Sequence, residues 1–111
     1  MPFDNKLNKS EEERLYLLGE ELNESGQAVF KILCHGYDSY NPIEPGMGNN
    51  KEQLQRELAH ILVAIDRLCF AGDLDMLEIE EEVLVKIPRM QQYLHYQSRE
   101  FMEVKCRQER S

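Results

Sequence analysis

Apolar residues recur every three or four positions along most of this chain, which is the spacing of one face of an α-helix. The first such run predicts a helix over residues 10–35. Ser10 and Glu13 form a capping-box pattern at its start, and Gly36 is a suitable left-handed residue at its end. The apolar positions of this run are Leu15, Leu18, Leu22, Val29, Ile32 and Leu33.

Residues 37–49 interrupt the helical pattern with two prolines and two glycines. A connection of this length is unusual within a small helical domain and predicts a functional loop. A second helix is expected after it, because Asn50 and Gln53 form another capping-box pattern and Gly72 provides a stop. Its apolar positions are Leu54, Leu58, Ile61, Leu62, Ile65, Leu68 and Cys69.

The C-terminal part of the chain predicts two further helices. Asp73 or Asp75 is expected to cap the third helix, and Pro88 either kinks that helix or begins a new one. Its apolar positions are Leu77, Ile79, Val83, Leu84 and Ile87, and the pattern continues at Met90, Tyr93, Leu94, Phe101, Met102 and Val104. With no strand pattern in the sequence, the predicted fold class is all-α, with about four helices packed as a bundle.

The chain has 111 residues, which suits one domain spanning residues 1–111. Residues 1–9 are expected to form a flexible arm and residues 105–111 a frayed tail. The formal net charge of −8 argues against nucleic-acid binding, which needs clustered basic residues, and is compatible with capture of divalent cations.

The three cysteines lack the spacing of a zinc or redox motif, and their odd number prevents complete pairing. Free thiols in a reducing cytoplasm are the simplest interpretation. The polar N-terminus does not resemble a signal peptide, and no apolar run approaches the roughly 18 residues of a membrane span. The expected location is therefore cytoplasmic, with no membrane contact.

Acidic residues are spaced on the first two helices in a way that predicts a metal site. Glu21 and Glu24 are three residues apart, as are Glu57 and His60, so each pair shares one helix face. If the two helices pack antiparallel, all four side chains converge on one place, as in metal sites built within helical bundles. Lys31 continues the acidic stripe and could contact a phosphate. For the first helix alone, an ordinary solvated face is the simpler interpretation.

These residues resemble the motifs of a known family. The segment EELNE at 20–24 resembles the EExxE motif of MazG-like nucleoside triphosphate pyrophosphohydrolases, and ELAH at 57–60 lies where that family carries ExxD. The acid-rich first helix and turn-rich loop are similar to small MazG-like proteins, including phage-encoded ones. The resemblance covers roughly residues 10–75.

The resemblance implies a four-helix bundle of the all-α NTP pyrophosphatase type that assembles as a homodimer or homotetramer. It also implies hydrolysis of nucleoside triphosphates between the α and β phosphates, which gives a nucleoside monophosphate and pyrophosphate, with Mg²⁺ or Mn²⁺ as cofactor. The implied metal ligands are Glu21, Glu24, Glu57 and His60. The implied catalytic acids are Glu20 and Glu21, and the implied substrate contacts are Lys31, Asn49 and Asn50.

His60 is a departure from the family, which has an aspartate at this position. A neutral imidazole is a poor Mg²⁺ ligand but a fair one for Mn²⁺, Co²⁺, Ni²⁺ or Zn²⁺. Asp66 cannot replace it, because a residue nine positions from Glu57 points to the opposite side of the helix. Three outcomes stay open: an active enzyme, a catalytically degenerate bundle that binds nucleotide or a protein partner without turnover, and a purely structural oligomer.

Overall fold

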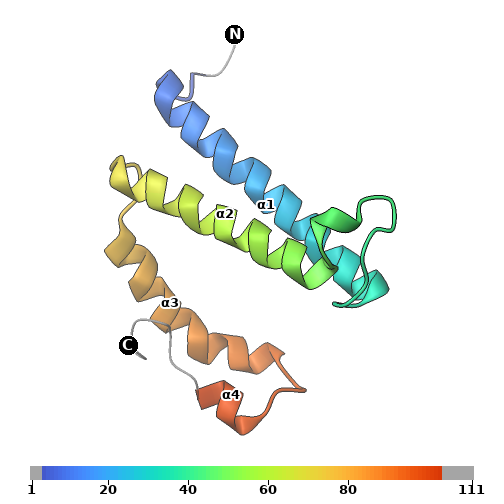
Figure 1. Ribbon diagram of the computed structural model, residues 1–111. Coiled ribbons are helices and arrows are strands. Elements are labelled where there is room, and N and C mark those ends of the chain that lie inside the picture. The colour runs from blue at the N-terminus through green and yellow to red at the C-terminus, as the bar shows by residue number, and fades with distance from the viewer. Residues whose placement is uncertain (1–3, 104–111) are drawn as a thin grey trace. The chain divides into compact units, whose positions relative to one another are not determined.

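The computed structural model describes residues 4–103, and its regular structure is helical apart from one isolated β-bridge between Tyr40 and Asn49. The described part contains four α-helices: α1 (Lys9–His35), α2 (Asn50–Phe70), α3 (Met76–Met90) and α4 (Arg99–Glu103) (Figure 1). Two 3₁₀ turns, η1 (Pro45–Met47) and η2 (Gln91–Tyr93), lie between them. The all-α prediction is confirmed. Among the described residues, no helix is both long and apolar enough to cross a membrane.

The described part of the chain divides into two compact units, one that ends at Leu74 and one that begins at Asp75. In the second unit, the Asp75 side chain accepts a hydrogen bond from the backbone N–H of Leu77 at 2.9 Å and caps α3. Pro88 lies inside the last turn of α3. The helical pattern expected up to Val104 is broken between Tyr93 and Arg99, and Val104 and the predicted tail lie outside the described residues.

The N-terminus of α1 lies earlier than the sequence pattern predicted. Asn8 is the capping residue: its Oδ1 accepts from the N–H of Glu11 at 2.8 Å, and Glu11 Oε1 accepts from the N–H of Asn8 at 3.0 Å. The prediction that Ser10 and Glu13 form this capping box is therefore wrong by two residues. Helix α1 begins inside the segment that was expected to be a flexible arm.

A similar correction applies to α2. Its capping box is made by Asn49 and Glu52, with hydrogen bonds of 2.9 and 3.2 Å, rather than by Asn50 and Gln53. The end of α1 is predicted correctly: Gly36 has φ 89° and its N–H donates to Ile32 at 2.7 Å.

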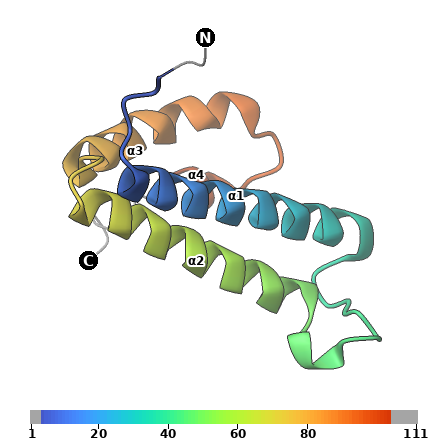
Figure 2. The same cartoon turned by 90° about the horizontal axis from the view of Figure 1, so that it is seen from above.

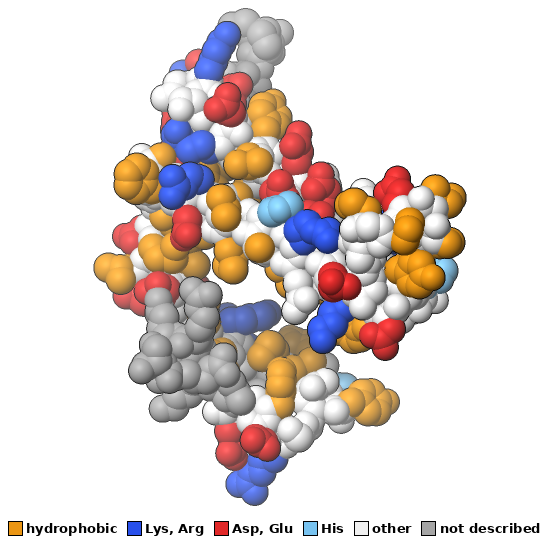
Figure 3. Space-filling view, in the orientation of Figure 1, with side chains coloured by type: hydrophobic (Ala, Val, Ile, Leu, Met, Phe, Trp, Pro, Cys, Tyr) orange, Lys and Arg blue, Asp and Glu red, His pale blue; other side chains and the backbone are white. Residues whose placement is uncertain are grey.

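Helices α1 and α2 run antiparallel and side by side along most of their lengths (Figures 1 and 2). The fully buried apolar residues of the described chain are few and mostly small: Ala28, Ala64 and Leu68. Small side chains let two helices approach closely, since interhelical distance depends on the residues at the contact. Larger apolar residues of the predicted core stay partly exposed, including Leu33 at 73% and Leu62 at 53% (Figure 3 shows such apolar side chains at the surface).

A bidentate ion pair joins the start of α1 to the turn that follows α2. Arg14 donates from Nε and Nη2 to the two carboxylate oxygens of Asp73, at 2.6 and 3.0 Å, and from Nη1 to Ser10 at 2.8 Å. Hydrogen bonding from the guanidinium lowers the pKa of Asp73 below its usual value and raises the pKa of Arg14. This pair fixes one end of the α1–α2 hairpin.

Asn50 holds the opposite end of the hairpin. Its side chain is only 6% exposed and donates to the carbonyl of Gly36 at 3.0 Å, while its backbone N–H donates to Ser39 at 2.8 Å. The next residue, Lys51, donates its backbone N–H to Tyr37 at 3.0 Å. The start of α2 is thereby tied to the end of α1, so both ends of the hairpin set the register between the helices.

Replacing Asp73 with asparagine is expected to lower the melting temperature at neutral pH by a few degrees. Because the folded-state pKa of Asp73 is depressed, its contribution is present above the unfolded-state value and is lost as pH falls through the folded-state value. The wild type should therefore lose its advantage over Asp73→Asn below about pH 4. Calorimetry across pH measures this. The control is Asp66→Asn, an equal charge change at an exposed position of α2. Equal effects of the two substitutions would contradict a stabilising role of the ion pair between Asp73 and Arg14.

Asn50→Ala is expected to cost about 1–3 kcal/mol in the free energy of unfolding, because the Gly36 carbonyl loses its buried donor. Urea denaturation should show a lower midpoint with an unchanged slope. The exposed residue Gln55 on the same helix gives a matched control, and Gln55→Ala should change stability by no more than about 0.5 kcal/mol. A mild effect of Asn50→Ala would show that the Asn50 contact does not hold the hairpin.

Candidate metal centre

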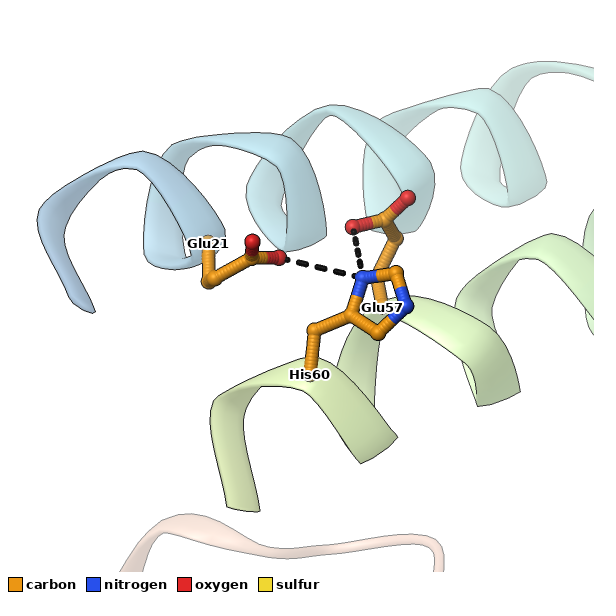
Figure 4. Close-up of side chains that lie close together, drawn as sticks. All are labelled: Glu21, Glu57 and His60. Atoms are coloured by element: carbon orange, nitrogen blue, oxygen red, sulfur yellow. Dashed lines mark ion pairs between the residues drawn. The ribbon is translucent and has the colours of Figure 1, made fainter. Parts of the chain in front are cut away.

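Three predicted ligands meet between α1 and α2 (Figure 4). Glu21 comes from α1, while Glu57 and His60 lie one turn apart on α2, and both carboxylates point toward the imidazole. His60 Nδ1 lies 3.2 Å from Glu21 Oε2 and 3.6 Å from Glu57 Oε2. The three ligand atoms all lie within 4.8 Å of one another. The predicted antiparallel pairing of the two helices therefore brings Glu21, Glu57 and His60 together.

One carboxylate oxygen of each glutamate in this cluster is buried without a hydrogen bond. Oε2 of Glu21 and Oε2 of Glu57 are inaccessible to solvent and have no hydrogen-bond partner among the described residues, although His60 lies within ion-pair distance. Buried charged oxygens are costly unless they are paired or coordinate a metal. The side chain of His60 is 47% exposed, so the cluster opens to solvent on the imidazole side.

Glu24 and Glu20, the other predicted acids, are not members of this three-residue group. Both side chains are exposed on α1. Glu21 faces α2, whereas the direction of Glu20 is rotated from it by about 100° and that of Glu24 by about 60°. The assignments of Glu24 as a metal ligand and Glu20 as an accessory acid stay predictions.

A pocket of about 400 Å³ lies at the loop end of the same hairpin. Its lining includes two of the predicted substrate contacts, Lys31 and Asn50, and the loop residue Tyr40. The third predicted contact, Asn49, does not line it, and its side-chain oxygen accepts from Glu52 at the helix cap. The full lining is Lys31, His35, Ser39, Tyr40, Asn41, Pro42, Asn50 and Gln53.

This pocket lies close to the carboxylate cluster along the hairpin. Gln53, which lines the pocket, precedes Glu57 by one helical turn, or about 6 Å of rise. Lys31 is exposed and forms no ion pair with another described residue. The hairpin thus carries an anionic cluster and, further toward the loop, a pocket with an available cation.

Ser25 is a residue of this region that the sequence interpretation missed. Its side chain is 6% exposed and its Oγ is buried with no hydrogen-bond partner in the described chain. It follows Glu21 by one turn on the same face of α1. It therefore lies about 6 Å further along α1 than Glu21, toward the loop end of the hairpin. Ser25 lies four residues after Glu21 and three before Ala28, and this spacing indicates that all three share one face of α1. The sequence interpretation missed it because a serine in a helix is usually taken to face solvent.

The donor set fits a divalent cation. Two carboxylate oxygens and one imidazole nitrogen form an open three-ligand site, and a cation there would satisfy the two buried oxygens that lack hydrogen bonds.

No protein-family model, curated protein or solved structure matches this chain. The resemblance to MazG-like proteins stays a prediction carried by the motifs at residues 20–24 and 57–60.

Saturating Mn²⁺ is expected to raise the melting temperature of the protein by several degrees. A ligand that binds only the folded state at about 100 times its Kd adds about 2.7 kcal/mol of stability. Glu21→Gln should abolish most of this rise, whereas Glu78→Gln, at an exposed position of α3, should keep it. Differential scanning calorimetry with and without Mn²⁺ measures both, and an equal rise in the two variants would rule out a site at Glu21.

Proposed function

We propose that this protein is a metal-dependent nucleoside triphosphate pyrophosphohydrolase related to the MazG-like family. The observation that carries the proposal is the meeting of Glu21, Glu57 and His60, which belong to the two separate motifs of the resemblance. Acidic residues that serve only as solvated surface groups are not expected to converge from two helices, because burying their oxygens without hydrogen bonds costs free energy.

In this proposal Glu21, Glu57 and His60 hold the cation. When bound, the cation supplies positive charge opposite the phosphate oxygens and makes water a better nucleophile. Water adds across the bond between the α and β phosphates, which gives a nucleoside monophosphate and pyrophosphate. The proton released by the attacking water passes to a carboxylate oxygen of Glu21, with exposed Glu20 as the accessory acid that orients the water.

The pocket beside the cluster provides a place for the rest of the substrate. Lys31 contributes positive charge for a phosphate group, and Asn50 lines the pocket while its side chain donates to the Gly36 carbonyl. Tyr40 offers an aromatic surface on the loop side, where the base or sugar would rest. The functional role predicted for the loop at 37–49 is supported by its contribution of Tyr40 and its neighbours to the lining.

The proposed assembly is a homodimer or homotetramer built as a helical bundle. Its support is the number of large apolar side chains that stay exposed on α1 and α2, such as Phe30 at 66% and Val63 at 56%. Exposed apolar patches of this kind are characteristic of surfaces that associate.

Purified protein is expected to release pyrophosphate from at least one nucleoside or deoxynucleoside triphosphate with Mg²⁺ or Mn²⁺. Glu57→Gln should reduce the rate by about a hundredfold or more, since loss of a carboxylate removes a metal ligand. Its control is Glu78→Gln, which should retain the wild-type rate. A pyrophosphate-release assay across nucleotides, with both metals in parallel, measures this. Absence of release with every nucleotide and both metals would reject the proposal.

The distance between His60 and Glu21 favours one alternative function. His60 Nδ1 lies within ion-pair distance of Glu21 Oε2, at 3.2 Å, and a contact of this kind would join the two helices without a metal. The protein would then be a catalytically silent bundle that binds a nucleotide or a protein partner. Appearance of pyrophosphate release only in His60→Asp would support this alternative, and turnover by the wild type would reject it.

A further inference from the structure

We infer that the cluster selects a later transition-metal cation such as Co²⁺ over Mg²⁺, and that Ser25 completes the site. The inference concerns the metal site on which the proposed function rests, but it does not depend on hydrolysis. The inferred site differs from a magnesium site made only of carboxylates in two donors, the nitrogen of His60 and the hydroxyl of Ser25.

His60 contributes nitrogen at the centre of the cluster. Its Nδ1 faces both carboxylates, at 3.2 and 3.6 Å, and no hydrogen bond of normal geometry joins it to either oxygen. The ring is therefore oriented as a third ligand rather than as a hydrogen-bond donor to one carboxylate. Imidazole suits zinc, copper, iron and nickel, whereas magnesium prefers oxygen ligands and retains several waters.

The helix fixes this donor set. Glu57 and His60 are three residues apart on α2, so their side chains are neighbours on one face and cannot separate without unwinding the helix. Glu21 enters from α1 at the register that the two hairpin ends impose. A cation at this place would meet two carboxylate oxygens and one nitrogen at the same time.

Ser25 gives a second observation, independent of the Glu21, Glu57 and His60 cluster, that points to a ligand between the helices. A hydroxyl that is more than nine-tenths buried normally has a hydrogen-bond partner, yet Oγ of Ser25 has none in the described chain. It lies one turn beyond Glu21 on the same face of α1, and it is buried like Ala28 further along that face. A cation, or a water held by a cation, between these helices would give this hydroxyl the partner that it lacks.

Metal binding to the full-length chain, without nucleotide, tests the inference. Isothermal titration calorimetry of the wild type should show Co²⁺ binding about tenfold or more tighter than Mg²⁺. His60→Asp should reduce this ratio about tenfold or more, because Co²⁺ loses its nitrogen ligand and Mg²⁺ gains an oxygen. His95→Asp, an equal change at an exposed histidine, should leave the ratio unchanged.

Pulsed electron paramagnetic resonance of bound Mn²⁺ gives a readout that a merely structural histidine would not change. The wild type and His95→Asp should show coupling to a directly bound nitrogen, and His60→Asp should lose it. Equal affinity for Mg²⁺ and Co²⁺, or absence of nitrogen coupling in the wild type, would overturn the inference.

Ser25→Ala separates a role in metal binding from a role in packing. The variant should bind Co²⁺ about tenfold more weakly, while its melting temperature without metal should stay equal or rise, because a buried hydroxyl without a partner is removed. Unchanged Co²⁺ affinity would exclude Ser25 from the site. If the protein prefers Co²⁺ but releases no pyrophosphate, the proposed function is rejected and this inference stands. If Mg²⁺ supports pyrophosphate release and bound Mn²⁺ shows no nitrogen coupling, this inference is rejected and the proposed function stands.

Discussion

The register between α1 and α2 is the constraint on which the rest of the first unit depends. Two helices that meet through small residues such as Ala28 and Ala64 can slide along each other, because few side chains interlock at their contact. Arg14 and Asp73 hold one end of the hairpin, and Asn50 holds the other through the carbonyl of Gly36. A slip of one turn would separate the carboxylates by about 5.4 Å.

Stability and function compete at the centre of this hairpin. Two carboxylate oxygens and a serine hydroxyl occupy positions where apolar side chains would pack more favourably. Buried charged groups in proteins are normally paired or coordinate a metal. The fully buried apolar residues between the helices are few, and many flanking apolar residues are exposed, so the hairpin has little packing energy with which to offset this cost. A bound cation or a second subunit would supply the missing stabilisation.

Much of the helical architecture could be read from the sequence because it depends on local interactions. Apolar periodicity predicted α1 and α2, and Gly36 predicted the end of α1. The caps were misplaced because Ser10 with Glu13, and Asn8 with Glu11, satisfy the same pattern, and local chemistry does not choose between them. The C-terminal helix was predicted too long, since the apolar spacing there does not reveal the break after Tyr93.

The sequence by itself determined that acids stand at helical spacing on two helices and that His60 follows Glu57 by three residues. Residue types could not tell which glutamate enters the cluster, because Glu20, Glu21 and Glu24 are chemically equivalent until one face of α1 packs against α2. Tertiary structure decided that Glu21 enters, that Glu24 stays exposed, and that Ser25 is buried beside it. The reason is geometric: about 100° of rotation per residue separates neighbours in sequence, and only the partner helix defines which direction is inward.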